Sequence, residues 1–207
     1  MITEQRGTLY IIAAASGTGK TSLAEALVQK VDNLKISISH TTRPIGAKEE
    51  ANRHYFYVTT AQFEELIQRG SFLEYAKVFN NYYGTSRDFV EQQLAHGTDI
   101  ILDIDWQGAR QVREKIACQT IFLLPPSKTE LQRRLENRQR EDSRLIAQRL
   151  QIASSEISHY QEFDYIIIND NFNHALADLE AIIRANRLLL EKQQLKYRSL
   201  LADLADC

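Results

Sequence analysis

The segment from Leu9 to Thr21 places chemically active residues directly after an apolar run of strand length. It reads LYIIAAASGTGKT, so a glycine-rich turn is followed by a lysine and a threonine. Glycines permit a tight turn whose backbone N–H groups converge on phosphate oxygens at the positive end of the next helix. In such a loop Lys20 reaches the β- and γ-phosphates, and the Thr21 hydroxyl holds Mg²⁺. The predicted phosphate loop comprises Ala14, Ala15, Ser16, Gly17, Thr18, Gly19, Lys20 and Thr21.

One position departs from the strict phosphate-loop pattern G-x-x-x-x-G-K-[ST]. Ala14 occupies the place of the first glycine, and an alanine there requires only that its φ angle be negative. An alternative interpretation is a Gly/Ser turn that happens to contain a lysine. The required order of strand, turn and helix disfavours it, because Leu23, Leu27 and Val31 recur every fourth residue and predict the helix.

Arginine is concentrated between Gln132 and Leu150. One interpretation is a solvated helix pair, because acidic residues are mixed among the arginines. The phosphate loop favours another, since phosphoryl transfer requires neutralisation of the moving group and planar guanidinium groups supply it. We therefore predict a lid that closes on the phosphates. Its arginines are Arg133, Arg134, Arg138, Arg140, Arg144 and Arg149.

Asp103 and Asp105 follow the apolar strand that begins at Ile100. Ligands of open α/β sheets bind at the carboxyl ends of the strands, and a carboxylate there commonly assists Mg²⁺. The alternative is that one of the two aspartates caps the helix that begins near Gln107.

The order of elements predicts an α/β fold. Apolar strands alternate with helical patterns, which favours a parallel sheet covered by helices on both faces. The strands are predicted at 34–39, 99–103, 120–124 and 165–168, in addition to the one before the phosphate loop. Short aromatic runs between residues 39 and 97 indicate a small α+β insertion. A capping box at 127–130 predicts the start of a helix. We predict a mobile loop at 136–144, a helix at about 143–161 and one long helix from about 173.

Composition limits the class of protein. The 207 residues are 43% hydrophobic and 25% charged, with a net charge of -2, which gives no reason to expect binding to nucleic acid or membranes. The first residues lack a signal region, and no apolar run approaches the length of a membrane helix, so we expect a cytoplasmic protein. Two cysteines and five histidines lack the spacing of a disulfide framework or a zinc site. The leucines of the last helix permit self-association into a homo-oligomer, although such a helix ordinarily packs on the core.

Taken together, the motifs resemble those of the guanylate kinases, especially the bacterial enzymes, over essentially the whole chain. They are SGTGKT, SHTTR, HYFYV, FLEYAKVFNNYYGTS, ILDIDWQG, LPPS before the arginine helix, and IIIND. The resemblance implies a P-loop core at 1–38, 98–128 and 152–207, a GMP-binding region at 39–97 and a lid at 129–151. It also implies transfer of the γ-phosphoryl group of Mg²⁺-bound ATP to GMP, with dGMP as a further acceptor.

The resemblance assigns roles to individual residues. Ala14 to Thr21 match the ATP phosphate loop, and Thr21 and Asp103 the metal side of the site. Arg43, Tyr55 and Tyr83 match the ligands of the GMP phosphate. Ser39, Glu74, Thr85 and Asp105 match the residues around guanine. Arg134, Arg138 and Arg149 match the lid arginines that act, with Lys20, on the transferring group.

The hydrogen-bonding pattern of guanine independently supports the base-binding role of Glu74. Guanine presents N1–H and an exocyclic N2–H₂ on one edge, so a carboxylate accepts from both, whereas adenine presents a lone pair at N1. The chain departs from the family pattern at Gly46, where a second phosphate-binding arginine is usual. Two alternatives stay open: either Lys48, two residues on, supplies an imperfect replacement, or the remaining phosphate ligands act with one cation fewer.

Two rival functions remain at this point. A kinase for another small phosphate ester is disfavoured by Glu74 together with Asp105. A guanylate-kinase-like interaction module without catalysis is disfavoured by the intact Lys20, Thr21 and lid arginines.

Overall fold

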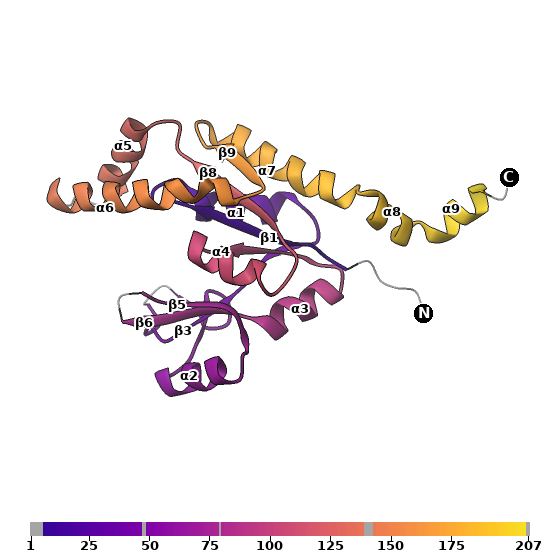
Figure 1. Ribbon diagram of the computed structural model, residues 1–207, viewed down its shortest axis with the longest axis horizontal. Coiled ribbons are helices and arrows are strands. Elements are labelled where there is room, and N and C mark those ends of the chain that lie inside the picture. Colours follow the sequence, from indigo (N-terminus) through magenta and orange to yellow (C-terminus); the bar gives the residue numbers. More distant parts are fainter. Residues whose placement is uncertain (1–5, 47–48, 79, 139–142, 206–207) are drawn as a thin grey trace.

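Two β-sheets organise the chain in the computed structural model (Figure 1). The structure describes residues 6–46, 49–78, 80–138 and 143–205, without the side chains of 138 and 143–146. The larger sheet has five parallel strands in the order β2-β7-β1-β8-β9. These are β1 (Leu9–Ala14), β2 (Leu34–Ile36), β7 (Asp99–Asp103), β8 (Gln119–Leu124) and β9 (Tyr165–Ile168).

The central strand β1 is buried on both sides because its side chains alternate between two apolar layers. Tyr10 and Ile12 pack with α1 (Lys20–Lys30) and α7 (Phe172–Arg187). Leu9 and Ile11 pack with α3 (Arg87–Ala95) and α4 (Trp106–Arg113). Helices therefore cover both faces of a parallel sheet, and the predicted α/β fold class is confirmed.

The second sheet has the order β4-β3-β6-β5 and lies in the segment predicted as an α+β insertion. Its strands are β3 (Ser39–Thr41), β4 (Tyr55–Tyr57), β5 (Phe72–Val78) and β6 (Asn81–Ser86), and α2 (Thr60–Gln68) packs against it. Phe63 of α2 stacks on Phe72 and Tyr82, with ring centroids 4.5 and 5.1 Å away. The single strand predicted at 34–39 is wrong, because the chain changes sheet between Ile36 and Ser39.

Two helices, α5 (Lys128–Arg138) and α6 (Ser143–Ile157), lie on the side of the core away from the second sheet (Figure 1). Ser127 caps α5 by accepting a 3.0 Å bond from the Glu130 backbone N–H. The mobile loop predicted at 136–144 is wrong at both ends, since α5 extends to Arg138 and α6 begins at Ser143, and its middle lies outside the described residues. The helix predicted to 161 ends at Ile157, and the 3₁₀ segment η1 (Ser158–Glu162) follows.

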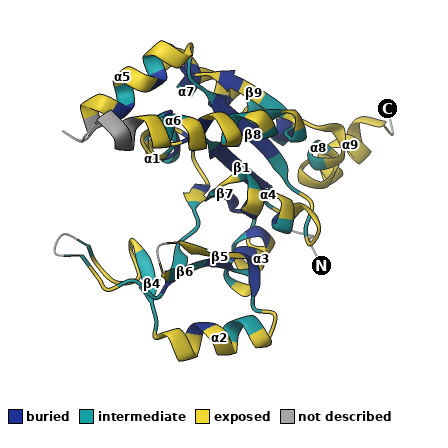
Figure 2. Ribbon diagram, turned by 60° about the vertical axis from the view of Figure 1, so that its left-hand side comes forward, coloured by how far each residue is buried: buried dark blue, intermediate teal, exposed yellow. Residues whose placement is uncertain are grey.

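The long last helix is also interrupted. It consists of α7, α8 (Leu190–Lys196) and α9 (Arg198–Ala205). Figure 2 shows α9 as exposed and α8 as partly exposed, and neither helix contains a buried residue. The expectation that this whole segment packs its leucines on the core is therefore wrong for α8 and α9, although Lys192 of α8 donates to the Thr8 hydroxyl. Among the residues described, no helix combines the length and hydropathy needed to span a bilayer.

Candidate active site

The phosphate loop connects β1 to α1 at the carboxyl end of the central strand. Gly17 and Gly19 have φ angles of +86° and +94°, a region that glycine enters without strain. Ala14 is absent from the positive-φ residues among those described, so the condition predicted for alanine at this position is met. The Thr18 hydroxyl donates a 2.6 Å bond to the Ala15 carbonyl and tightens the turn.

Asn169 and Arg134 hold this loop from outside. The Asn169 side chain donates a 2.7 Å bond to the Thr18 carbonyl, and Arg134 donates a 2.9 Å bond to the Asn169 carbonyl. A Cβ at Gly19 would lie 2.8 Å from Asn169 Nδ2, so glycine is required there by space as well as by φ. Sequence reasoning missed Asn169, although its place after the β9 strand puts it at the same sheet edge as the loop.

Lys20, Thr21 and Asp103 form one polar group beside the loop. Lys20 Nζ lies 2.6 Å from Asp103 Oδ1 and donates a 2.8 Å bond to the Ile104 carbonyl, while Thr21 donates to Asp103 Oδ2 at 3.0 Å. The Lys20 side chain is only 19% exposed. Hydroxyl and carboxylate oxygens suit Mg²⁺, which needs few protein ligands when phosphates and water complete its shell. Thr21 and Asp103 therefore fit the predicted metal role.

Asp105 has a different position from Asp103. It is the N-cap of α4 and accepts a 2.8 Å bond from the Gly108 backbone N–H. The capping alternative thus holds for Asp105, and only Asp103 contacts Lys20 and Thr21. Asp105 lines the cavity of the phosphate loop as well.

Glu74 and Thr85 face each other across neighbouring strands β5 and β6. Thr85 donates a 2.5 Å bond to Glu74 Oε1, and a Cβ on Gly108 would lie 3.3 Å from Glu74 Oε2. Burial, opposed by the Thr85 hydrogen bond, raises the pKa of Glu74 to about 7. The Glu74 carboxyl group is thus buried beside the first turn of α4.

Arg43 is oriented by a residue that sequence reasoning missed. Its guanidinium donates a 2.7 Å bond to Glu49, which also accepts from Tyr57 at 2.9 Å and from the Gly46 backbone N–H at 2.7 Å. These hydrogen bonds, the one from Arg43 foremost, lower the pKa of Glu49 to about 2. The sequence signal that could have predicted this pair is the acidic Glu49 six residues after Arg43.

Two tyrosines complete the group around Arg43. The Arg43 guanidinium lies 5.6 Å from the ring centroid of Tyr55, whose ring is 6.0 Å from that of Tyr83. Tyr83 also lies close enough to Arg43 to help raise the pKa of its guanidinium, after the larger effect of Glu49. The structure therefore brings together all three residues predicted for the GMP phosphate.

Two cavities lie side by side at this edge of the core. The first, about 630 Å³, is lined by the whole phosphate loop with Asp105, Arg134 and Glu156. The second, about 290 Å³, is lined by Ser39, Tyr55, Thr85 and Asp103 among others, and Thr21 lines both. Glu156 of α6 was not predicted, and its carboxylate accepts a 3.4 Å bond from the Ser16 backbone N–H.

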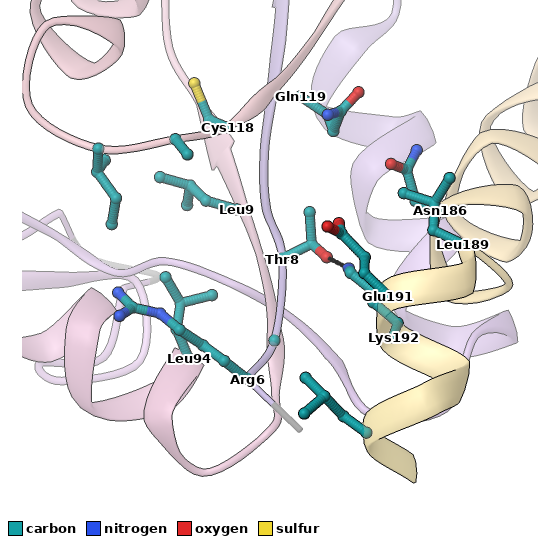
Figure 3. A pocket seen from close by; sticks show the side chains of 14 residues that line it. Arg6, Thr8, Leu9, Leu94, Cys118, Gln119, Asn186, Leu189, Glu191 and Lys192 are labelled. Carbon is teal, nitrogen blue, oxygen red and sulfur yellow. Dashed lines mark hydrogen bonds between the residues drawn. The ribbon is translucent and has the colours of Figure 1, made fainter. Parts of the chain in front are cut away.

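A further cavity of about 560 Å³ lies at the opposite end of β1 (Figure 3). It is bordered by Leu9, Leu94 and Cys118 and by Leu189 and Lys192 of the C-terminal segment, and Lys192 donates to the Thr8 hydroxyl. None of the predicted site residues lines it. The candidate site is therefore confined to the carboxyl ends of the strands.

Some predicted residues are not assembled with the rest. Arg149 is on α6 but is not among the described residues that line either cavity. Arg140, Lys48 and the side chains of Arg138 and Arg144 lie outside the described part of the chain. Gly46 does not have a positive φ, and a Cβ there would meet only the carboxylate end of Glu49, at 2.8 Å.

The parallel sheet carries a glycine-rich phosphate loop that ends in a lysine and a threonine, and an arginine-bearing helix pair lies beside it. This arrangement defines a P-loop nucleotide-binding protein. The family model for guanylate kinases matches residues 6–186. The chain therefore belongs to the guanylate kinase family.

Individual relatives agree with this assignment. The guanylate kinase of Vibrio parahaemolyticus is 52% identical over 199 residues, which cover 95% of this chain and 96% of that protein. The guanylate kinase of Pseudoalteromonas translucida is 50% identical over 202 residues, covering 96% or more of both. The crystal structure of guanylate kinase from Anaplasma phagocytophilum superposes with a TM-score of 0.73 at 28% identity, covering 96% of this chain and 97% of that one.

Proposed function

We propose that this chain transfers the γ-phosphoryl group of ATP to GMP, giving ADP and GDP. The observation that carries the proposal is that Thr21 lines both cavities, so a donor held by the phosphate loop meets an acceptor held between Tyr55 and Thr85. Family membership supports the same activity. We extend the proposal to dGMP as an acceptor and to a cytoplasmic location. We also propose three functional parts: a nucleotide-binding core at 1–38, 98–128 and 152–207, a GMP-binding region at 39–97, and a lid at 129–151.

The residues would divide the chemistry as follows. Thr21 and Asp103 would hold Mg²⁺, which supplies charge neutralisation between the β- and γ-phosphates. Lys20 would leave Asp103 to contact the transferring group, with Arg134, Arg138 and Arg149 as the lid cations. Movement of α5 and α6 towards the phosphate loop would exclude water, so that GMP instead of water accepts the phosphoryl group.

A substrate panel tests this function against its rivals. ADP formation should be fast with GMP, slower with dGMP, and near background with AMP, UMP and dTMP. Comparable turnover of AMP or UMP would support a kinase for another phosphate ester. Absence of turnover with every acceptor, in protein that binds GMP, would support a non-catalytic interaction module.

Glu74→Gln tests the base-reading role. Glutamine keeps the shape but replaces one acceptor oxygen with a donor that faces the donors of guanine. We expect the preference for GMP over AMP to fall by about 1–3 kcal/mol, measured as the ratio of kcat/KM values. Unchanged preference would remove Glu74 from base recognition.

The raised pKa of Glu74 predicts how the reaction depends on pH. Guanine binding requires the carboxylate, but with a pKa of about 7 the free enzyme holds most of this group protonated at pH 6. The GMP KM should therefore be about tenfold higher at pH 6 than at pH 8. Because the phosphate of GMP also titrates near pH 6, Glu74→Gln serves as the control and should show only the smaller dependence that remains.

Raising the pH, which favours GMP binding through Glu74, lowers the stability of the free protein through the same residue. Its folded-state pKa lies above that of an unfolded glutamate, so its contribution to folding is full below about pH 4.5 and is lost as the pH rises through about 7. GMP binding offsets this loss, since the ligand supplies hydrogen bonds to the carboxylate.

A further inference from the structure

The cavity proposed for GMP requires positive charge at one end. GMP would place its base at Thr85, which lines this cavity and donates to Glu74, and its phosphate towards Thr21, because the phosphate loop holds the donor. Asp103, which accepts a hydrogen bond from Thr21, and Glu25 also line this cavity. A phosphate dianion placed there would be repelled unless cations face it.

The positive charge of Arg43 is largely neutralised by Glu49. Its guanidinium is paired at 2.7 Å with Glu49, and a carboxylate with a pKa of about 2 is ionised at neutral pH. The pair is partly buried, with the side chains 31% and 24% exposed, and Gly46 and Tyr57 also donate to Glu49. Arg43 and Glu49 together are close to neutral, so Arg43 can orient a phosphate but leaves most of its charge uncompensated.

Arg53 is the one lysine or arginine among the described residues that line this cavity. A hydrogen-bonded turn fixes it two residues before Tyr55. In this turn the Asn52 N–H donates 3.0 Å to the Tyr55 carbonyl, and Asn52 has a φ of +64°, which asparagine tolerates. The Arg53 backbone is therefore held at the rim, while its side chain is 72% exposed and able to turn inwards.

The present partner of Arg53 is easily exchanged. Arg53 meets Glu50 at 3.1 Å, and the Glu50 side chain is 66% exposed. Solvent screens such pairs, which contribute little to stability, whereas a guanidinium forms a two-pronged contact with phosphate. Exchange of Glu50 for a phosphate oxygen is therefore favourable.

We propose that Arg53 is a ligand of the GMP phosphate and supplies the cation that the chain lacks at Gly46. The inference rests on the proposed function and on the placement of GMP in this cavity. It assigns the phosphate to Arg53, Arg43, Tyr55 and Tyr83, with Arg53 carrying the uncompensated positive charge.

The test is GMP binding by calorimetry, with GMP saturation at fixed Mg²⁺-bound ATP. Arg53→Ala should weaken GMP binding about tenfold or more, leave the ATP KM unchanged, and lose this effect progressively as salt rises. Arg53→Lys should restore part of the affinity, because it keeps the charge without the planar geometry. Arg69→Ala is the matched control, since Arg69 forms an equally exposed pair with Glu65 on α2 and should be silent.

A second variant makes the inference more specific. Gly46→Arg in the Arg53→Ala background should recover part of the GMP affinity, since Gly46 lacks a positive φ, although a Cβ there lies 2.8 Å from the Glu49 carboxylate and requires that carboxylate to shift. A GMP affinity of Arg53→Ala within twofold of that of the Arg69→Ala control would overturn the proposal. It would also be overturned if Lys48→Ala weakened GMP binding tenfold while Arg53→Ala did not.

Arg43→Ala separates this inference from the proposed function. Weakened GMP binding by Arg43→Ala with silence at Arg53→Ala would leave the GMP site in place and remove Arg53 from it. Silence of both variants would show that the phosphate lies elsewhere and would contradict the proposed placement of GMP itself.

Discussion

Lys20→Ala should lower kcat by about 10²–10³-fold while the fold stays intact. Lys20 stands at the end of the phosphate loop, where its ammonium group reaches the charge that develops on the transferring phosphoryl group. In the free protein it is paired with Asp103 at 2.6 Å, and this pairing places it next to the proposed Mg²⁺ ligands. Single-turnover measurements at saturating ATP and GMP give the chemical step directly.

The Asp103 contact also sets the stability expected of this variant. With 19% exposure Lys20 is partly buried, and its loss leaves Asp103 without its cation. We expect a cost of about 1 kcal/mol, or a fall in Tm of about 2–4 °C. Lys30→Ala, on the same helix and paired with Glu180, is the control that should keep full activity. Near-normal turnover of Lys20→Ala would remove the catalytic role of this loop.

The phosphate loop was predictable because its chemistry is contiguous in the sequence. Eight consecutive residues provide the turn, the cation and the hydroxyl, and the flanking strand and helix each have their own periodicity. The parallel core was predictable for a related reason, since β1, β7, β8 and β9 are short apolar runs bounded by helical patterns. Local information was sufficient in both cases.

Contacts between distant segments could not be predicted in this way. Asn169 is 151 residues from the Thr18 carbonyl to which it donates, and no periodicity relates the two. The passage from β2 to β3 was missed because Leu34 to Ser39 alternates as one strand would, although two different sheets pair with its halves. The leucines of α8 and α9 repeat as in a buried helix, yet the chain bends at Leu189 and Tyr197 and leaves them exposed.

The lid arginines provide the second large effect. Arg138→Ala and Arg149→Ala should each lower kcat by about 10³-fold, with much smaller changes in either KM. Arginines on a closing lid meet the phosphoryl group chiefly in the transition state, so their loss affects the chemical step more than substrate binding. Arg149 is not among the described residues lining either cavity, which agrees with a contact made only after α6 moves.

Arg134 should behave differently from the other two, because it already acts in the open structure. It donates to the Asn169 and Thr18 carbonyls and so braces the phosphate loop. Arg134→Ala should therefore raise the ATP KM as well as lower kcat. Arg133, one residue earlier, pairs with Glu130 and has a side chain that is 63% exposed, so Arg133→Ala is the control on the same helix. A pure rise in ATP KM for Arg138→Ala and Arg149→Ala would instead make them ground-state ligands of ATP, and the lid would then bind the donor without stabilising its transfer.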